Sequence, residues 1–240
     1  QMEMEFFCHP DKTEKWLNYW KEERLNWFKS LGIDENKLRL RPHGGDELAH
    51  YSSACYDVEY KFDFGWSELE GIADRGTFDL DQHINASGKK LTYFDQANNE
   101  HFVPAVVEAS AGVDRAVLTL LADAFTKEEV NGESRTVLKL DPKIAPIKVA
   151  VFPLMNKNNM PEISQKIVED IRLSGMASFY DSGGSIGKRY RRQDEAGTPF
   201  GITVDHDTLE DNTVTIRDRD TMQQERISID KIVDALKNKL

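Results

Sequence analysis

The C-terminal part of the chain has a pattern that few folds can accommodate, because short apolar strands alternate with amphipathic helices. Such alternation is typical of an α/β domain in which helices pack on a sheet. The predicted strands cover residues 147–152, 177–180, 202–205 and 214–217, and the predicted helices cover 161–174, 185–195 and 229–240. Residues 144–240 are therefore predicted to form an α/β domain.

Residues 1–143 follow a less regular pattern that mixes longer helices with strands. Between them and the α/β domain lies the polar stretch 126–143, which contains Asn131-Gly132 and is followed by prolines, so we place a domain boundary near residue 143. The predicted strands lie at 2–7 and 38–41, within 90–103 and in the β-rich run from Pro104, and the predicted helices at 12–31, 46–59, 68–71 and 116–124.

Composition narrows the classes of function. The net charge of −11 argues against a general nucleic-acid coat, but residues 144–240 carry 14 basic and 15 acidic residues and can hold a local basic patch. The chain shows no apolar run of the roughly 18 residues that a membrane span needs, and no basic leader at its start, so no membrane partner is expected. With only Cys8 and Cys55, a cytoplasmic protein without a zinc site is expected.

The segment from Glu108 to Arg115 is the most informative for function. A carboxylate, the Ser110 hydroxyl and Gly112 stand at the end of a predicted strand, and Arg115 opens an apolar helix. Strand, glycine turn and helix together form a unit that often presents ligands, and an arginine there can bind a phosphate or stack on a base. The plainer interpretation is an ordinary helix start with Glu108 facing solvent.

Other acidic residues and the histidines have ordinary explanations. Glu3 and Glu5 share one face of a predicted strand, which fits a solvated edge strand, and Glu68 and Glu70 fit a solvated first helical turn. The histidines show no metal-binding spacing, and no nucleophilic triad is apparent, so neither metal ligands nor covalent catalytic residues are predicted.

A dense basic cluster lies in the helix predicted at 185–195. Four cations and Tyr190 on one short helix suit an RNA backbone and a stacked base, although pairing with Asp194 and Glu195 is an equally good explanation. The cations are Lys188, Arg189, Arg191 and Arg192.

Five segments together carry a resemblance over essentially the whole chain: QMEMEFF at residues 1–7, RPH with ELAHY between 41 and 51, GWSELEGIADR at 65–75, EASAGVDR at 108–115 and GKRYRRQDEAGTPF at 187–200. In these segments the sequence resembles a known family, the homodimeric glycyl-tRNA synthetases of class II. The resemblance implies the C-terminal part of an antiparallel class II catalytic sheet for residues 1–143 and an anticodon-binding domain for residues 144–240.

The family's reaction and binding residues are also implied by the resemblance. Glycine attacks the α-phosphate of ATP, with Mg²⁺, to give glycyl-adenylate, and the 3′ end of glycine tRNA then accepts the glycyl group. The implied glycine contacts are Gln1, Met2, Glu3, Glu108, Ala109, Ser110, Ala111 and Gly112. The implied ATP contacts are Glu68, Leu69, Gly112, Val113, Asp114 and Arg115, of which Arg115 matches the γ-phosphate clamp.

Two family features are not found in the sequence. These are the first class II motif, which builds the homodimer interface, and the arginine-bearing part of the second motif, so we expect a fragment that is inactive alone. Two alternatives remain open: a non-catalytic relative such as the accessory subunit of the mitochondrial DNA polymerase, or another class II synthetase, for threonine, proline or histidine.

Overall fold

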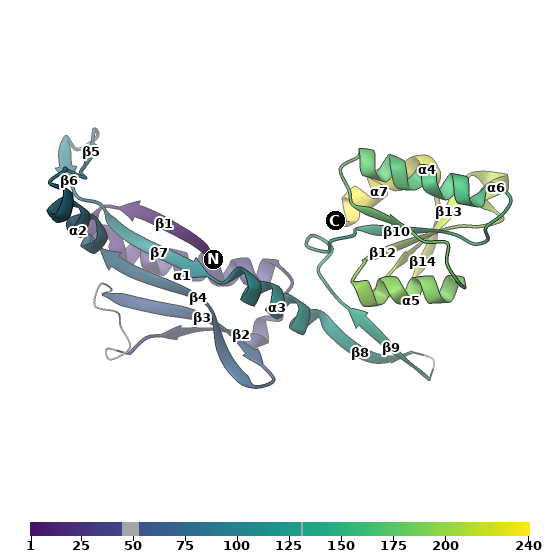
Figure 1. The fold of residues 1–240 in the computed structure, drawn as a ribbon, viewed down its shortest axis with the longest axis horizontal. Coiled ribbons are helices and arrows are strands. Elements are labelled where there is room, and N and C mark those ends of the chain that lie inside the picture. The colour runs from purple at the N-terminus through teal and green to yellow at the C-terminus, as the bar shows by residue number, and fades with distance from the viewer. Residues whose placement is uncertain (45–52, 131) are drawn as a thin grey trace. The chain divides into compact units, whose positions relative to one another are not determined.

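The computed structural model describes residues 1–44, 53–130 and 132–240 and divides into two compact units, Gln1–Asp123 and Ala124–Leu240 (Figure 1). The second unit includes a hairpin that precedes residue 143, so the predicted boundary at 143, which rests on the change of pattern, stays a prediction. In the described residues, no helix is long and apolar enough to cross a membrane.

The first unit is built on a five-stranded antiparallel sheet with the order β1-β7-β4-β3-β2, so β1 is an edge strand as expected. The 3-10 turns Pro10–Lys12 and Glu35–Lys37 lie before and after the long helix α1 (Thr13–Ser30). The strands are β1 (Met2–Cys8), β2 (Leu38–Pro42), β3 (Ala54–Phe62), β4 (Gly65–Gly76) and β7 (Ala105–Ala111).

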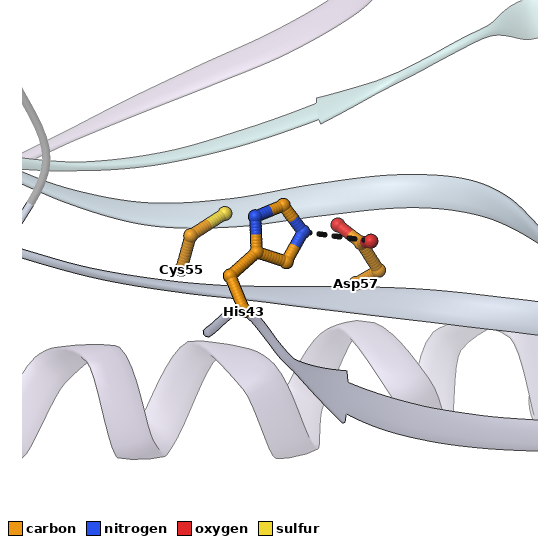
Figure 2. Close-up of side chains that lie close together, drawn as sticks. All are labelled: His43, Cys55 and Asp57. Carbon is orange, nitrogen blue, oxygen red and sulfur yellow. Dashed lines mark ion pairs between the residues drawn. The ribbon is translucent and has the colours of Figure 1, made fainter. Parts of the chain in front are cut away.

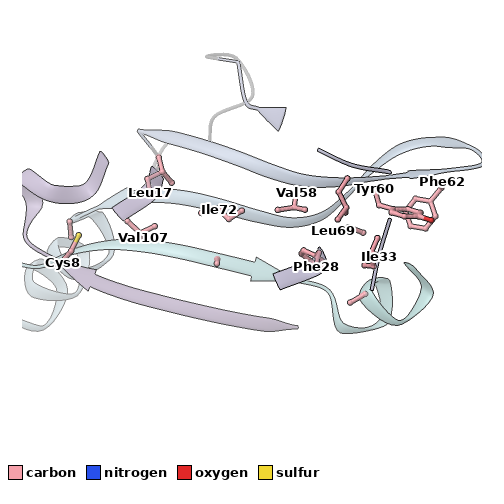
Figure 3. Close-up of a cluster of buried hydrophobic side chains, with 14 residues drawn as sticks. Cys8, Leu17, Phe28, Ile33, Val58, Tyr60, Phe62, Leu69, Ile72 and Val107 are labelled. Atoms are coloured by element: carbon pink, nitrogen blue, oxygen red, sulfur yellow. The ribbon is translucent and has the colours of Figure 1, made fainter. Parts of the chain in front are cut away.

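Helix α1 (Thr13–Ser30) covers one face of this sheet and forms the core of the unit with it. Its apolar residues recur every three or four positions, which places Leu17 and Phe28 on the side that faces the strands. Figure 3 shows these two side chains with Val58, Ile72 and Val107 from three neighbouring strands. The core thus lies on one face only, and the other face of the sheet stays polar.

The remaining elements of the first unit lie at its margins. The strands predicted within 90–103 are confirmed as a small hairpin whose turn includes Asn99 at φ 52°, and the predicted helix at 116–124 is confirmed within α3. The elements are α2 (Phe78–Ser87), β5 (Tyr93–Asp95), β6 (Glu100–Phe102) and α3 (Val113–Ala124).

Two predicted helices in the first unit are wrong. The helix at 46–59 lies partly outside the described residues, and its described C-terminal part belongs to β3. The helix at 68–71 is the middle of β4. The second error has a local cause: a β-bulge pairs Val58 with Glu70 and Glu59 with Glu68, which leaves Leu69 extra and breaks the period-2 pattern of β4.

The second unit is an α/β structure around a five-stranded mixed sheet with the order β11-β10-β12-β13-β14. Helices α4 and α7 cover one face of this sheet and α5 covers the other (Figure 1). The sheet strands are β10 (Val149–Pro153), β11 (Ser178–Tyr180), β12 (Phe200–Val204), β13 (Thr213–Asp218) and β14 (Gln224–Ser228). The helices are α4 (Met160–Leu173), α5 (Ile186–Ala196), α6 (Thr208–Asp211), a 3-10 turn at Ile229–Lys231, and α7 (Ile232–Lys239).

The α/β expectation for this region is confirmed, and the structure adds elements that the sequence did not predict. The polar stretch 126–143 contains a hairpin of β8 (Phe125–Val130) and β9 (Glu133–Leu138). Strand β14 and the short α6 were also missed, because β14 is short and polar and has no apolar alternation of its own.

Candidate functional site

The face of the first sheet that α1 leaves uncovered holds the chemistry predicted from residues 108–115. Side chains alternate along β7, so Val107, Ala109 and Ala111 are buried toward the core, while Glu108 and Ser110 point to the other face. The methyl group of Ala109 packs in the core, so the glycine contact assigned to this residue stays a prediction that only its main chain can fulfil.

Cross-strand pairing lines up the polar residues of β1 and β7 in two rows. In the first row Glu3 lies opposite Ser110, which lies opposite Gly71 on β4. In the second row Glu5 lies opposite Glu108, which lies opposite Ala73. The small residues of β4 leave a shallow floor beside the carboxylates.

Glu5 and Glu108 form a carboxylate pair, and Arg75 is the cation that lies beside it. Arg75 Nη1 lies 2.9 Å from Glu108 Oε2, and the Arg75 guanidinium also makes two hydrogen bonds to Asp79, at 2.6 and 2.9 Å. Burial and the charge and hydrogen bond of Glu108 raise the pKa of Glu5 to about 7, because Arg75 only partly offsets them. Sequence reasoning assigned Glu5 to solvent; its spacing of two residues from Glu3 was the available signal.

A cavity of about 420 Å³ opens at the junction of β7, β4 and α3. Arg115 bridges its walls, because its Nη1 donates to the Glu68 carbonyl oxygen at 2.7 Å, and Gln1 Nε2 donates to Ser110 Oγ at 3.2 Å. The lining residues are Gln1, Glu68, Leu69, Ser110, Ala111, Gly112, Val113, Asp114 and Arg115. The volume lies in the range of small-ligand sites.

The structure brings together most, but not all, of the residues assigned through the resemblance. Met2, Glu3, Glu108 and Ala109 are not among the lining residues. Glu3 and Glu108 share the polar face with Ser110, whereas Met2 alternates toward the core side of β1. The Leu69 side chain belongs to the core cluster, so only its main chain is available to the cavity.

The cavity has the chemistry to bind an anionic ligand next to a cationic one. Helix α3 begins at Val113, so its free backbone N–H groups and Arg115 lie on one side of the opening. Ser110 lines the opening, and the carboxylates of Glu3 and Glu108 lie on the same sheet face. Glu68, which is exposed, and Asp114 offer the hard oxygen ligands that a magnesium ion prefers.

In the second unit, the predicted basic cluster on α5 is divided between structural and exposed side chains. Arg189 is only 3% exposed, and its guanidinium donates to the carbonyl oxygens of Pro153, Ser182, Gly183 and Gly184. The prediction that Arg189 faces RNA is therefore wrong, since this side chain ties the loop before α5 to β10.

The other three cations of the cluster are exposed. Lys188 lies on the outer side of α5, Arg191 pairs with Glu133, and Arg192 pairs with Asp181 while donating to the Gly183 carbonyl at 2.7 Å. The aromatic side chain within the cluster, Tyr190, is half-buried. Its ring packs against Phe152, its hydroxyl lies 2.8 Å from Thr203 Oγ1, and the residue lines a cavity beside α5.

Next to the exposed cations lies a cavity of about 440 Å³ between α5, β9 and β13. Its floor is ionic: the buried carboxylate of Asp194 receives hydrogen bonds from Arg135 at 3.0 Å and from Arg217 at 3.0 and 3.3 Å. Arg191, Gly187 and Gln224 are among the residues at its rim. Polar donors and acceptors in a pocket of this size suit a nucleobase edge.

Comparison with known proteins gives concordant similarities. A family model described as an anticodon binding domain matches residues 148–239. The glycine–tRNA ligase of Caldanaerobacter subterraneus is 51% identical over 240 residues, which cover 100% of this chain and 51% of that protein. The glycine–tRNA ligases of Rhodopirellula baltica and Streptomyces coelicolor are 47% and 48% identical over 100% of the chain, covering 51% and 54% of their own lengths. The chain thus spans about half the length of these curated relatives.

Proposed function

The chain is homologous along its whole length to glycine–tRNA ligases, and from this premise we propose that it acts in the same reaction, the ATP-dependent attachment of glycine to its tRNA. The first step forms glycyl-adenylate and pyrophosphate, and the second transfers the glycyl group to the tRNA 3′ end. We also propose that the protein assembles as a homodimer and works in the cytoplasm. The proposed domains are a catalytic part at 1–143 and an anticodon-binding part at 144–240.

The single observation that carries this proposal is the cavity at the end of β7, which gathers Ser110, Gly112 and Arg115 with Glu68. In the proposed roles, Glu3, Glu108 and Ser110 bind the glycine ammonium, and Arg115 binds the terminal phosphate of ATP. Glu68 acts through Mg²⁺, for which its exposed carboxylate is a suitable oxygen donor.

The rate enhancement in such a reaction comes from positioning and charge, because the attacking and leaving groups belong to the substrates. Glycine has no side chain to grip, so its ammonium group supplies the affinity. A carboxylate on an otherwise apolar strand, such as Glu108, recovers its desolvation cost when a cation arrives. A non-catalytic relative has no such reason to keep this acidic set.

The catalytic part of the proposal is tested by binding of a non-hydrolysable glycyl-adenylate analogue to the purified chain, measured by calorimetry. Glu108→Gln should weaken binding at least tenfold because the contact with the ammonium is lost. Arg115→Ala should weaken binding of a non-hydrolysable ATP analogue by a similar factor, because the adenylate lacks the terminal phosphate that Arg115 is proposed to bind. Lys61→Ala, which removes an exposed cation from β3, is the matched control. Equal affinities for all four proteins would refute the assignment of the cavity.

For the anticodon-binding part, we compare binding of glycine tRNA and of an anticodon-substituted version at fixed salt. A preference for the native anticodon supports the proposal. Charge reversal at Arg191 and Arg192 should weaken binding and flatten its dependence on salt, because fewer phosphate contacts release fewer counterions. Unchanged affinity and slope would exclude α5 from the interface.

A further inference from the structure

Three side chains with metal-binding atoms meet at the β2–β3 end of the first sheet. His43 follows β2 and donates its backbone N–H to the Cys55 carbonyl at 3.0 Å, while Cys55 and Asp57 lie two residues apart on β3 and so share one face. Figure 2 shows the imidazole between the other two, with one ring nitrogen toward the Cys55 sulfur and the other toward the Asp57 carboxylate.

The distances are compatible with one shared ion. His43 Nε2 lies 2.8 Å from Asp57 Oδ2, and one ligand atom of each residue lies within 4.8 Å of the other two. In a tetrahedral zinc site the ligand atoms are roughly 3.5 Å apart, given zinc distances of about 2.3 Å to sulfur and 2.0 Å to nitrogen. Side-chain rotations that move these ligand atoms by about 1 Å would therefore bring them to the distances of a tetrahedral zinc site.

One of these atoms lacks a conventional partner. His43 Nε2 is shielded from solvent and has no aligned hydrogen bond within the described residues, despite its short approach to Asp57. That approach is a close contact between a ring nitrogen and a carboxylate oxygen, without the directionality of a hydrogen bond. An imidazole nitrogen and a carboxylate oxygen that face each other without a directed hydrogen bond can both serve as ligands of one metal ion.

A carboxylate stands close to the sulfur. Cys55 is half-buried and shares its face of β3 with Asp57, and the ligand atoms of both residues lie within 4.8 Å of each other. A metal ion that binds the sulfur replaces the thiol proton: the S–H bond breaks, a sulfur–metal bond forms, and the proton leaves to solvent.

One cation of the protein already lies beside the Asp57 carboxylate. Arg41 Nη1 lies 3.4 Å from Asp57 Oδ2 and so competes for that carboxylate. The other carboxylate oxygen, Oδ1, faces Gly71 on β4, which has no side chain to place against it.

We propose that His43, Cys55 and Asp57 bind one divalent transition-metal ion, and that zinc is the best match. A thiolate with an imidazole and a carboxylate selects a borderline-soft ion over magnesium or calcium. Three protein ligands leave the fourth position of a tetrahedral ion to water. The three ligands are not among the residues that line the proposed substrate cavity. Zinc binding here differs from the sequence-based expectation that no zinc is bound.

The test uses the purified, reduced and metal-free chain titrated with Co²⁺, whose spectrum reports its ligands. The expected result is one bound equivalent, tetrahedral visible bands and a sulfur-to-cobalt charge-transfer band, all displaced by one equivalent of Zn²⁺. Binding without the sulfur band would reveal adventitious sites at other histidines and overturn the proposal, as would no binding at all.

Cysteine variants show which of the two sulfur atoms binds the metal ion. Cys55→Ser should abolish the charge-transfer band and weaken Zn²⁺ binding at least tenfold, whereas Cys8→Ser, at the chain's other cysteine, should keep both. His43→Gln should weaken binding while retaining the thiol. A band that persists in Cys55→Ser would contradict the assignment.

A measurement on the unmodified protein avoids any dependence on variant folding. Zn²⁺ should slow alkylation of Cys55 by iodoacetamide at least tenfold, as followed by mass spectrometry of the two cysteine peptides. An unchanged rate at Cys55 would overturn the proposal even if the variants failed to fold.

Discussion

Glu5 on β1 and Glu108 on β7 are direct cross-strand partners. The cation beside this pair is Arg75, which forms ion pairs with both Glu108 and Asp79. Like charges opposite each other on a sheet destabilise it, and a shared guanidinium compensates only in part. The pair therefore holds a proton more tightly than isolated carboxylates do, which places a titrating group on the same face as Ser110.

The stability of the first unit should fall as pH rises through the range set by Glu5. Its pKa in the folded protein, about 7, exceeds the ordinary value of 4.5, so the folded state binds the proton better. The contribution of the Glu5 proton to stability is fully present below about pH 4.5 and is lost as the pH rises through about 7. After discounting for solvent screening, we expect this loss to lower the free energy of unfolding by about 1 kcal/mol.

Urea unfolding at pH 5 and pH 8 measures this loss. Glu5→Gln should reduce the difference between the two pH values. Glu3→Gln, which removes the same charge from the same strand but faces Ser110, is the control. An identical pH dependence in wild type and Glu5→Gln would show that the pair does not share a proton.

The buried ion pair between Arg24 and Glu70 should behave differently from surface pairs. Arg24 Nε donates to Glu70 Oε1 at 2.6 Å and Nη2 to Oε2 at 3.1 Å, and Glu70 is 1% exposed. Arg24→Met leaves a buried carboxylate whose pKa burial already raises, so we expect a loss of about 3–5 kcal/mol in the free energy of unfolding.

The double variant Arg24→Met/Glu70→Met should recover most of that loss, because it removes both charges. Lys29→Met breaks the more exposed pair with Glu35 and should cost at most about 1 kcal/mol. Denaturant unfolding measures all three variants. A double variant as unstable as the single one would show that packing, and not charge, is what Arg24 contributes.

Gly201 on β12 is required by the side chain that packs on it. A Cβ at this position would stand 2.5 Å from Tyr190 Cε1 and 3.3 Å from Phe152 Cε2. Gly201→Ala should lower stability by about 1–3 kcal/mol through overpacking. Gly187→Ala, at an open position on α5, should be neutral or stabilising by up to about 1 kcal/mol. Thermal unfolding distinguishes the two, and equal effects would contradict the packing account.

Within the α5 cluster, Arg189 and Lys188 should give opposite phenotypes. Arg189→Gln removes donors from buried carbonyl groups and should cost about 3 kcal/mol or more in stability. Lys188→Glu should leave the melting temperature unchanged while weakening tRNA binding and lowering the magnitude of the salt slope by about 1. A destabilised Lys188→Glu, or a stable Arg189→Gln with weaker binding, would reverse the roles given to them.

The sequence predicted those elements of the fold in which local periodicity and tertiary environment agree. Helix α1 and strand β10 are examples, because α1 carries apolar residues at helical spacing and β10 is a short continuous apolar run that is buried throughout. The prediction failed at β4, where a bulge disrupts alternation and Glu70, a residue that sequence assigns to the surface, is buried. It missed β9 because polar residues form that strand through pairing with β8.

For the candidate site, proximity along the chain was predictable and proximity across strands was not. The Glu108–Arg115 segment forms one wall of the cavity because it is contiguous. Partners from distant strands, such as Glu5 with Glu108 or Cys55 with His43, depend on the register of the sheet, which no local pattern specifies. The burial of Arg189 likewise depends on a loop that folds back over α5.

The alternation along β7 makes this strand far more sensitive to changes of length than to changes of side chain. A substitution at Val107 affects packing alone, and one at Ser110 affects the cavity alone. Insertion or deletion of one residue would rotate every later side chain to the opposite face, so that carboxylates would enter the core and apolar groups would line the cavity. Engineered variants and natural drift can therefore alter the two faces separately, but only while the strand keeps its residue count between Ala105 and Ala111.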